Sequence, residues 1–257
     1  MKEVSVNLDE FKLKVEQQVK VRNLLIDLPI KYKCQAINAI FSIDSEEARK
    51  VIKCSKLQPI KFSYRRSLLC ITMLDFYDTP VGPFKELTFS MIIIYNSKFN
   101  FPFVSIPINL VTKSFGFIPL SVAQSTDIAI EHGNIITGYP HYTRLINLEF
   151  KKAGSFINVE SYCGANKIIE FQIQKPKNEQ IRHESHNTYS LRDNKITKFI
   201  LETYGIMGKT KGGNLKLGNQ ELAGFLKKLK ISNKPIYTIY YRDTLKIISC
   251  PIVIDYL

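Results

Sequence analysis

The sequence of 257 residues contains no apolar run that approaches the 18 or more residues of a membrane-spanning helix. The longest candidates, such as residues 117–123, have only the length of a strand. The first residues, Met1-Lys2-Glu3, also lack the apolar stretch of a signal peptide. These absences predict a protein without a membrane span and a cytoplasmic location.

The cysteines are few, odd in number and far apart. None of them forms a close pair that would suggest a disulfide framework or a zinc module. They are Cys34, Cys54, Cys70, Cys163 and Cys250. Isolated cysteines usually behave as small buried hydrophobic residues. We therefore expect neither a metal nor a cofactor.

Acidic residues are scarce beside basic ones, with 23 Asp and Glu against 36 Lys and Arg, which gives a net charge of +13. Such a charge raises the question of an anionic partner. Basic clusters such as 12–22 and 209–216 accompany no recognition helix, zinc finger or aromatic–basic RNA motif. We interpret them as solvated surface and expect no nucleic-acid or membrane partner. Attraction to acidic ligands, nucleic acid or an anionic membrane is the alternative, and a salt titration would reveal it.

Short runs of β-branched and aromatic residues dominate the chain, separated by Pro, Gly, Asn and Asp. We predict strands over 36–43, 59–63, 67–77, 87–95, 104–111, 117–122, 141–150, 156–162, 167–174, 195–204, 214–217, 235–241 and 244–254. The run 91–94 is apolar on both faces and predicts a central strand. The spacing is typical of an antiparallel sheet or barrel with peripheral helices.

Helices are expected to be short. We predict them over 45–53, over 220–230 and from about residue 125 onward, with caps at Asp44 or Ser45 and at Asn219. Residues 7–24 also fit a helix, although the alternation in 11–15 fits a strand equally well. We predict a single α+β, β-rich domain over 1–257. In it, 1–29 is a peripheral segment and the polar stretch 176–194 is a loop.

Residues 129–150 form the most distinctive stretch: a helix end, a polar break, a tight turn at Gly138-Tyr139-Pro140, and then a strand. Pro140 fixes its own φ and extends Tyr139, while Gly138 permits a backbone shape that other residues resist. In a regular strand His141 would lie on the polar face, pointing away from Tyr142.

This stretch resembles the signature of the acetoacetate decarboxylase-like family, in which a small-residue helix, a Gly and a Tyr-Pro turn precede two lysines. Residues 38–52, 78–86 and 251–257 are similar to further segments of that family. The resemblance implies an antiparallel β-barrel or cone with its active site inside. It also implies a homo-oligomer and lyase activity on small carboxylic acids.

The departures from the family pattern concern the chemistry. Where the family has its two lysines, this chain has His141 and Tyr142. In the family the first Lys forms a Schiff base and the second lowers its pKa. An imidazole cannot form the iminium that stabilises the carbanion. The family's carboxylate-binding Arg aligns with Cys34, and one of its acids falls near Thr72. The other acid is retained, as Glu86.

Two candidate catalytic residues remain. His141 has a side chain suited to acid–base work at neutral pH, and a buried Glu86 would have a raised pKa suited to proton transfer. The alternatives are a histidine that merely fills space and an exposed glutamate. Arg144 is the first candidate to bind a substrate carboxylate, with Lys31 and Lys33 as rivals, although each could be surface charge.

We therefore expect a small oxo or hydroxy acid to bind in a barrel pocket beside Tyr139 and Tyr142. A lyase that uses His141 and Glu86 is the leading hypothesis. The alternative is a non-catalytic ligand-binding or interaction protein on the same scaffold.

Two other motifs suggest no further site. His183 and His186 have a spacing seen in metal sites, but no other ligand is near them in the sequence, so we expect solvated histidines. Residues 205–210 end in the Gly-Lys-Thr of a phosphate-binding loop but lack the rest of that motif, so we expect a turn.

Overall fold

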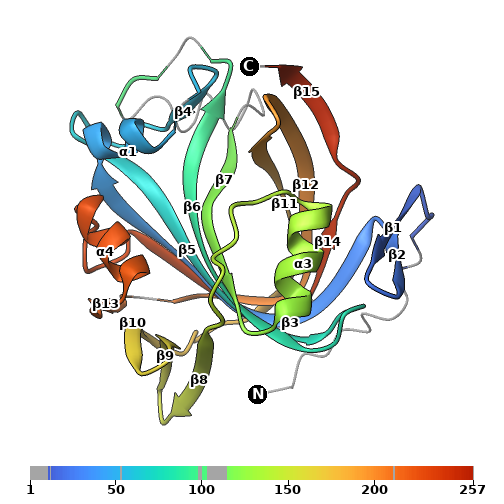
Figure 1. Ribbon diagram of the computed structural model, residues 1–257. Helices are drawn as coiled ribbons and strands as arrows, with labels where there is room; N and C mark the ends of the chain where they lie inside the picture. Colours follow the sequence, from blue (N-terminus) through green and yellow to red (C-terminus); the bar gives the residue numbers. More distant parts are fainter. Residues whose placement is uncertain are drawn as a thin grey trace.

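Seven strands hydrogen-bond in a closed ring in the computed structural model, which describes residues 11, 13–52, 54–97, 100–102, 115–210 and 212–256 (Figure 1). In ring order they are β3 (Ile30–Asp44), β14 (Tyr237–Ile248), β12 (Lys195–Thr210), β11 (Gln180–Arg192), β7 (Phe115–Gln124), β6 (Phe84–Tyr95) and β5 (Arg66–Asp78). Every pair in the ring is antiparallel except the short β11–β7 contact, which is parallel. The predicted β-rich barrel is confirmed.

Smaller elements surround this ring. The further strands are β1 (Gln17–Val21), β2 (Leu24–Leu28), β4 (Leu57–Pro59), β8 (Asn147–Ala153), β9 (Phe156–Cys163), β10 (Asn166–Gln174), β13 (Asn214–Leu217) and β15 (Ile252–Tyr256). The helices are α1 (Ser45–Val51), α3 (Asp127–Ile136) and α4 (Glu221–Lys228). Strands β8, β9, β10 and β13 form a second sheet, and α1 and α4 lie outside the barrel, as expected (Figure 1).

The main hydrophobic core lies outside the barrel, between its wall, the second sheet and α4. Ile37 and Phe41 of β3 belong to this core together with Phe171 of β10 and Leu226 of α4. The rings of Phe41 and Phe171 meet edge to face with centroids 5.8 Å apart. Because side chains alternate along a strand, the residues between these core positions point into the barrel. The inner face of the wall is therefore free to carry polar groups.

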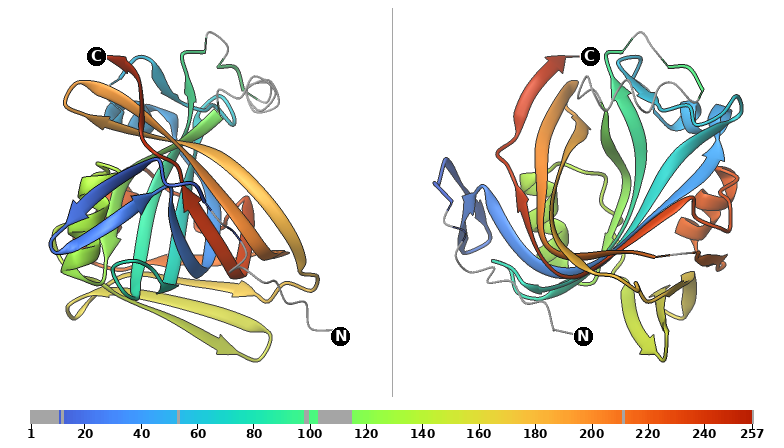
Figure 2. Two further views of the ribbon diagram at one scale, coloured as in Figure 1. Left: turned by 90° about the vertical axis from the view of Figure 1, so that its right-hand side faces the viewer. Right: turned by 180° about the vertical axis from the view of Figure 1, so that it is seen from behind.

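The N-terminal prediction was wrong where the structure tests it. Residues 17–28 form the β1–β2 hairpin rather than a helix, while residues 1–10 and 12 lie outside the described ranges. Alternating Val21, Ile26 and Leu28 bury one face of this hairpin, and a helix would have dispersed them. An ion pair of 2.7 Å between Arg22 and Glu131 joins the hairpin to α3, which lies beside it in the left view of Figure 2.

The polar stretch 176–194 is mostly strand, so the predicted loop was wrong. β11 pairs with β12 along its full length, from Gln180 opposite Met207 to Arg192 opposite Lys195. Its polar composition misled the sequence reading because it places polar side chains, His186 and Thr188, toward the cavity and leaves the outward-facing residues 181, 183 and 185 exposed. The hairpin turn uses two residues with positive φ, Asp193 and Asn194.

Other boundaries also shifted. The strand predicted to begin at 141 begins at Asn147, and the one predicted over 59–63 ends at Pro59. The strand predicted over 104–111 lies outside the described residues. The predicted turn at 205–210 is wrong because β12 continues through Thr210. The short helix capped by Asp44 and the hairpin of β9 and β10 are confirmed.

Candidate functional site

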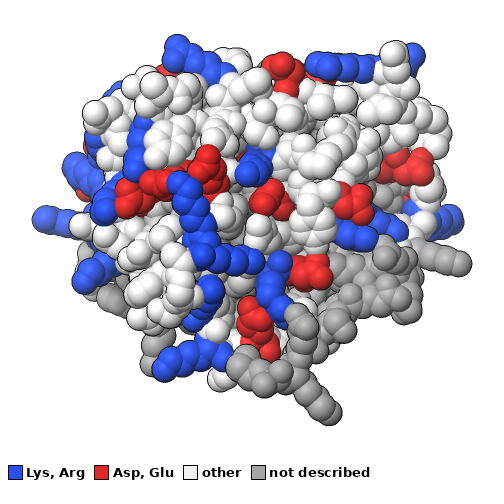
Figure 3. Space-filling view, turned by 90° about the horizontal axis from the view of Figure 1, so that it is seen from below, with Lys and Arg blue, Asp and Glu red and all other residues white. Residues whose placement is uncertain are grey.

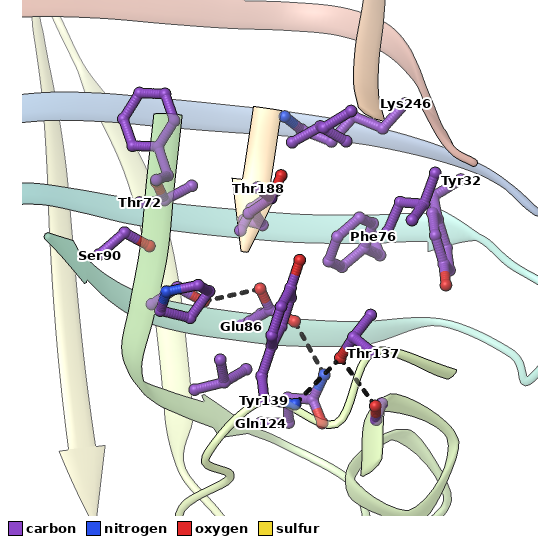
Figure 4. Close-up of a pocket in the computed structure, with 18 of the residues that line it drawn as sticks. Tyr32, Thr72, Phe76, Glu86, Ser90, Gln124, Thr137, Tyr139, Thr188 and Lys246 are labelled. Atoms are coloured by element: carbon purple, nitrogen blue, oxygen red, sulfur yellow. Dashed lines mark hydrogen bonds between the residues drawn. The ribbon is translucent and has the colours of Figure 1, made fainter. Parts of the chain in front are cut away.

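The barrel holds a cavity of about 140 Å³ (Figure 4). Helix α3 contributes His132 and Gly133 to its lining, and the signature turn contributes Tyr139 and His141. Polar side chains from the barrel wall also line it: Tyr32, Asn38, Thr72, Glu86, Thr88, Ser90, Gln124, His186, Thr188 and Lys246. The structure thus brings Glu86 and His141, which are 55 residues apart in the sequence, to one cavity.

Glu86 is held by hydrogen bonds to both of its carboxylate oxygens. The hydroxyl of Thr88 donates to Oε1 at 2.7 Å, and Nε2 of Gln124 donates to Oε2 at 2.8 Å. Glu86 and Gln124 are direct partners on neighbouring strands β6 and β7, so the sheet register fixes this contact. Each oxygen still has a free lone pair for a ligand or a proton.

His141 is positioned by the backbone of the signature turn. The carbonyl of Pro140 accepts a hydrogen bond from the amide of Val122, and the amide of Tyr142 donates to the carbonyl of Val122, so this segment is tied to β7. Nδ1 of His141 donates to the carbonyl of Tyr139 at 2.8 Å. Burial lowers the pKa of His141, and the Tyr139 carbonyl and the charge of Glu86 oppose this shift only in part. The imidazole is therefore neutral at pH 7, with its proton on Nδ1.

A second histidine in the lining, His132, was missed by the sequence reading. Its side chain is buried, and its Nε2 lies 3.3 Å from the hydroxyl of Tyr32. Burial, followed by the charge of His141, lowers the pKa of His132 to about 4. The sequence feature that could have pointed to His132 was its position in the second half of the predicted helix, directly before Gly133.

The two tyrosines predicted to bind substrate lie in different places. Tyr139 lines the cavity, and burial raises its pKa, so its hydroxyl keeps its proton at neutral pH. Tyr142 does not line the cavity. Its hydroxyl accepts a hydrogen bond from Gln220, the N-cap residue of α4. The two side chains of the His141–Tyr142 pair do point apart, but the segment that carries them is not a regular strand.

None of the three cations predicted to bind a carboxylate lines the cavity. Arg144 is exposed, because the irregular segment before β8 turns it to solvent. Lys31 donates to the backbone carbonyl of Phe11, and Lys33 forms an ion pair of 3.4 Å with Asp78. The surface-charge alternative fits these positions, since the case for a carboxylate site assumed a regular strand after Pro140 and took proximity to Cys34 in the sequence as proximity to the cavity.

The cation in the described lining is instead Lys246 of β14, which the sequence reading did not consider. It is 5% exposed. Its signal was a single Lys in the run 245–248, where the other three residues are apolar. A lysine there has no solvent face to occupy, so it must either find a polar interior or disrupt the strand.

Sequence comparison identifies no relative, since neither a family model nor a curated protein matches the chain. Solved structures do match. The acetoacetate decarboxylase of Legionella pneumophila shares 12% identity over 98% of this chain and 99% of its own, with a TM-score of 0.62. A second acetoacetate decarboxylase shares 12% identity over 89% of each chain, with a TM-score of 0.61. The chain has the acetoacetate decarboxylase fold.

This fold also occurs in the enduracididine biosynthesis enzyme MppR complexed with pyruvate, at 9% identity over 89% of this chain and 91% of that one, with a TM-score of 0.59. The resemblance of the signature to the acetoacetate decarboxylase-like family is therefore confirmed at the level of the fold. The cavity inside the barrel agrees with the predicted place of the site.

The two histidines of 183–186 do not form one site. Residues three apart on a strand face opposite sides, so His183 stacks on Tyr204 at 4.0 Å outside the barrel while His186 lines the cavity. The expectation that both are solvated was wrong for His186, which packs edge to face on Phe117. Within the described ranges, no three His, Cys, Asp or Glu side chains gather as metal ligands would.

The surface carries charges of both signs. Lys151, Glu160, Lys167 and Glu170 form a chain of ion pairs of 2.7–3.1 Å across the second sheet. Seen from below, acidic and basic side chains are mixed rather than separated into one basic area (Figure 3). No helix among the described residues is long and apolar enough to span a membrane. The predicted homo-oligomer stays a prediction.

Proposed function

We propose that the barrel cavity binds a small oxo or hydroxy acid and that Glu86 and His141 transfer a proton at the carbon next to its carbonyl group. The observation that carries this proposal is that an oriented carboxylate and a neutral imidazole line the same cavity. Such a pair is a common basis of acid–base catalysis.

The proposed step needs a base, a stabiliser for the developing charge and a route for the proton. Glu86 takes the proton from the carbon, and the electrons of the broken C–H bond form the C=C bond of an enolate. Tyr139, which keeps its proton, donates a hydrogen bond to the enolate oxygen. Neutral His141 accepts the proton from Glu86 and exchanges it with water. An enolate is also an intermediate in lyases that break a C–C or C–O bond next to a carbonyl group, which is the reaction class we propose.

Two structures of the same fold support the choice of ligand. MppR has been solved with pyruvate and with the condensation product of pyruvate and imidazole 4-carboxaldehyde. The second complex covers 88% of this chain and 88% of that one at 10% identity, with a TM-score of 0.57. Because His141 and Tyr142 replace the family's lysine pair, we propose proton transfer without a Schiff base at the signature.

A non-catalytic ligand-binding protein is the second candidate. The packing of His141 against Gly133 favours it, because that contact restricts the movement a proton relay would need. Under this alternative the cavity binds a small acid and releases it unchanged.

Hydrogen–deuterium exchange separates the two candidates. Pyruvate, 2-oxobutyrate and acetoacetate are incubated with the protein in D2O, and loss of the protons next to the carbonyl is followed by NMR. We expect exchange above the buffer rate with at least one acid. Glu86→Gln should lower it about a hundredfold or more, and Lys33→Met, outside the cavity, should not change it. Binding without exchange would establish the second candidate.

A further inference from the structure

We infer that Lys246 is the anion-binding residue of the cavity and that it pairs with the carboxylate of the ligand. This inference rests on the proposed function only in taking the cavity as the ligand site. The inference adds the charge of the ligand and its orientation in the cavity. The pair of Glu86 and His141 does not determine either of them.

The ammonium group of Lys246 is buried and forms no ion pair with a described residue, although its charge contributes to the lowered pKa of Glu184. Within the described ranges its Nζ meets the hydroxyl of Thr203 at 3.5 Å and has no carboxylate within ion-pair distance. Glu184 lies in the same cross-strand row, with Thr203 between them. Its carboxylate, however, accepts a hydrogen bond of 2.8 Å from Tyr241 and lies 3.7 Å from His186. An unpaired buried ammonium is costly, and an anionic ligand would remove that cost.

The surroundings of Lys246 favour a charged ammonium over a nucleophilic amine. The ring face of Tyr241 lies 5.3 Å from Nζ, and this contact is attractive only for a cation. The hydroxyl of Thr203 can accept a hydrogen bond from the ammonium. Lysines that act as nucleophiles are often made so by a second cation, and the described lining contains no other Lys or Arg. Ion pairing is therefore the role we assign.

An irregularity in β14 turns Lys246 inward. Between Tyr241 and Thr244 this strand has one residue more than its partner β3, so the alternation changes phase. Tyr241 and Lys246 consequently share the inner face, and a regular strand would have placed Leu245 there instead. Gly205 of β12 accommodates the bulge, because its φ is +139° and a β-carbon would stand 2.3 Å from the carbonyl of Asp243. Bulges of this kind often re-aim a side chain at a functional site.

Lys246 and Glu86 project from opposite walls. Around the seven-stranded ring, β14 and β6 are three strands apart in one direction and four in the other. Figure 4 shows Lys246 entering the cavity from the side away from Glu86 and Gln124. The carboxylate of the ligand would therefore lie at the β14 wall and its reacting carbon near Glu86.

Two unpaired acceptors refine the class of ligand. Oδ1 of Asn38 and Oε1 of Gln124 are buried without hydrogen-bond partners, and both residues line the cavity. Asn38 bonds Tyr241 near Lys246, whereas Gln124 bonds Glu86. Buried acceptors that lack donors are costly. They fit a ligand that carries hydroxyl groups as well as its carboxylate, namely a hydroxylated carboxylic acid.

Calorimetry with charged and uncharged forms of the same molecules tests the inference. The probes are pyruvate, lactate and glycerate, each beside its methyl ester. The wild type should bind at least one acid about tenfold or more tightly than its ester. Lys246→Met should weaken acid binding about ten- to a hundredfold and leave ester binding unchanged, which also shows that the variant is folded. Lys246→Arg should keep the preference for the acid, and Lys33→Met should match the wild type.

The outcomes separate this inference from the proposed chemistry. Acid preference that depends on Lys246, without proton exchange, supports the ion pair and rejects the acid–base step. If Lys246→Met still catalyses proton exchange and binds the acid as tightly as the wild type, the ion pair is rejected and the acid–base step is not. A wild type that binds none of the acids rejects both. A covalent adduct on Lys246 after incubation with pyruvate and borohydride would replace the ion pair by a nucleophilic role.

Discussion

The imidazole of His141 lies so close to Gly133 that a β-carbon on this glycine would stand 2.2 Å from Nε2. The ring cannot easily withdraw, because its Nδ1 is bonded to the carbonyl of Tyr139. The glycine of the signature helix is therefore the residue that makes room for the histidine of the signature turn.

Gly133→Ala should destabilise the protein by about 1–3 kcal/mol, the usual cost of overpacking, although alanine favours a helix. Gly224→Ala in α4 is the matched control, since nothing lies within 4 Å of its added methyl group. That variant should gain about 0.5–1 kcal/mol. Urea unfolding measures both. In a His141→Ala background the penalty of Gly133→Ala should disappear, and a penalty that persists there would mean that another contact causes it.

His132 should make the fold sensitive to mild acid. Its folded pKa is about 4, below the ordinary value of 6.5, so the unfolded chain takes up a proton first as the pH falls. Stability present above pH 6.5 is lost between about pH 6.5 and 4, by roughly 3 kcal/mol from this group. Unfolding at several pH values should therefore show a shallower loss in His132→Asn. His183→Asn, which changes an exposed histidine, should keep the wild-type slope.

The sequence predicted the barrel because its strands are local patterns with clear punctuation. Strand β6, for example, is apolar on both faces over 91–94, and that run is fully buried. The sequence did not predict the cation of the site, because the direction of Lys246 depends on a bulge that only the pairing of β14 with β3 reveals. Strand β11 was missed for a related reason: it places polar side chains toward the cavity, and only part of its outward face is apolar and buried, so no clear alternation marks it.

Lys246→Met should make the ligand-free protein as stable as the wild type or more stable. A buried ammonium without an ion pair is costly, and an apolar side chain of similar size does not carry that cost. Thermal unfolding without ligand measures this. A variant more stable than the wild type would indicate that Lys246 serves ligand binding at a cost in stability, as functional residues often do. A strong destabilisation would instead show that Lys246 supports the barrel through Thr203 and Tyr241.

The two signature tyrosines should respond differently to the loss of a hydroxyl. Tyr142→Phe removes the acceptor for Gln220 outside the cavity, so it should cost about 1 kcal/mol of stability and leave proton exchange unchanged. Tyr139→Phe removes the proposed donor to the enolate oxygen, so it should slow exchange about a hundredfold. NMR exchange rates and urea unfolding on both variants decide the matter. If Tyr142→Phe slowed exchange as much as Tyr139→Phe, the barrel cavity would be the wrong site, because Tyr142 does not line that cavity and its hydroxyl bonds Gln220.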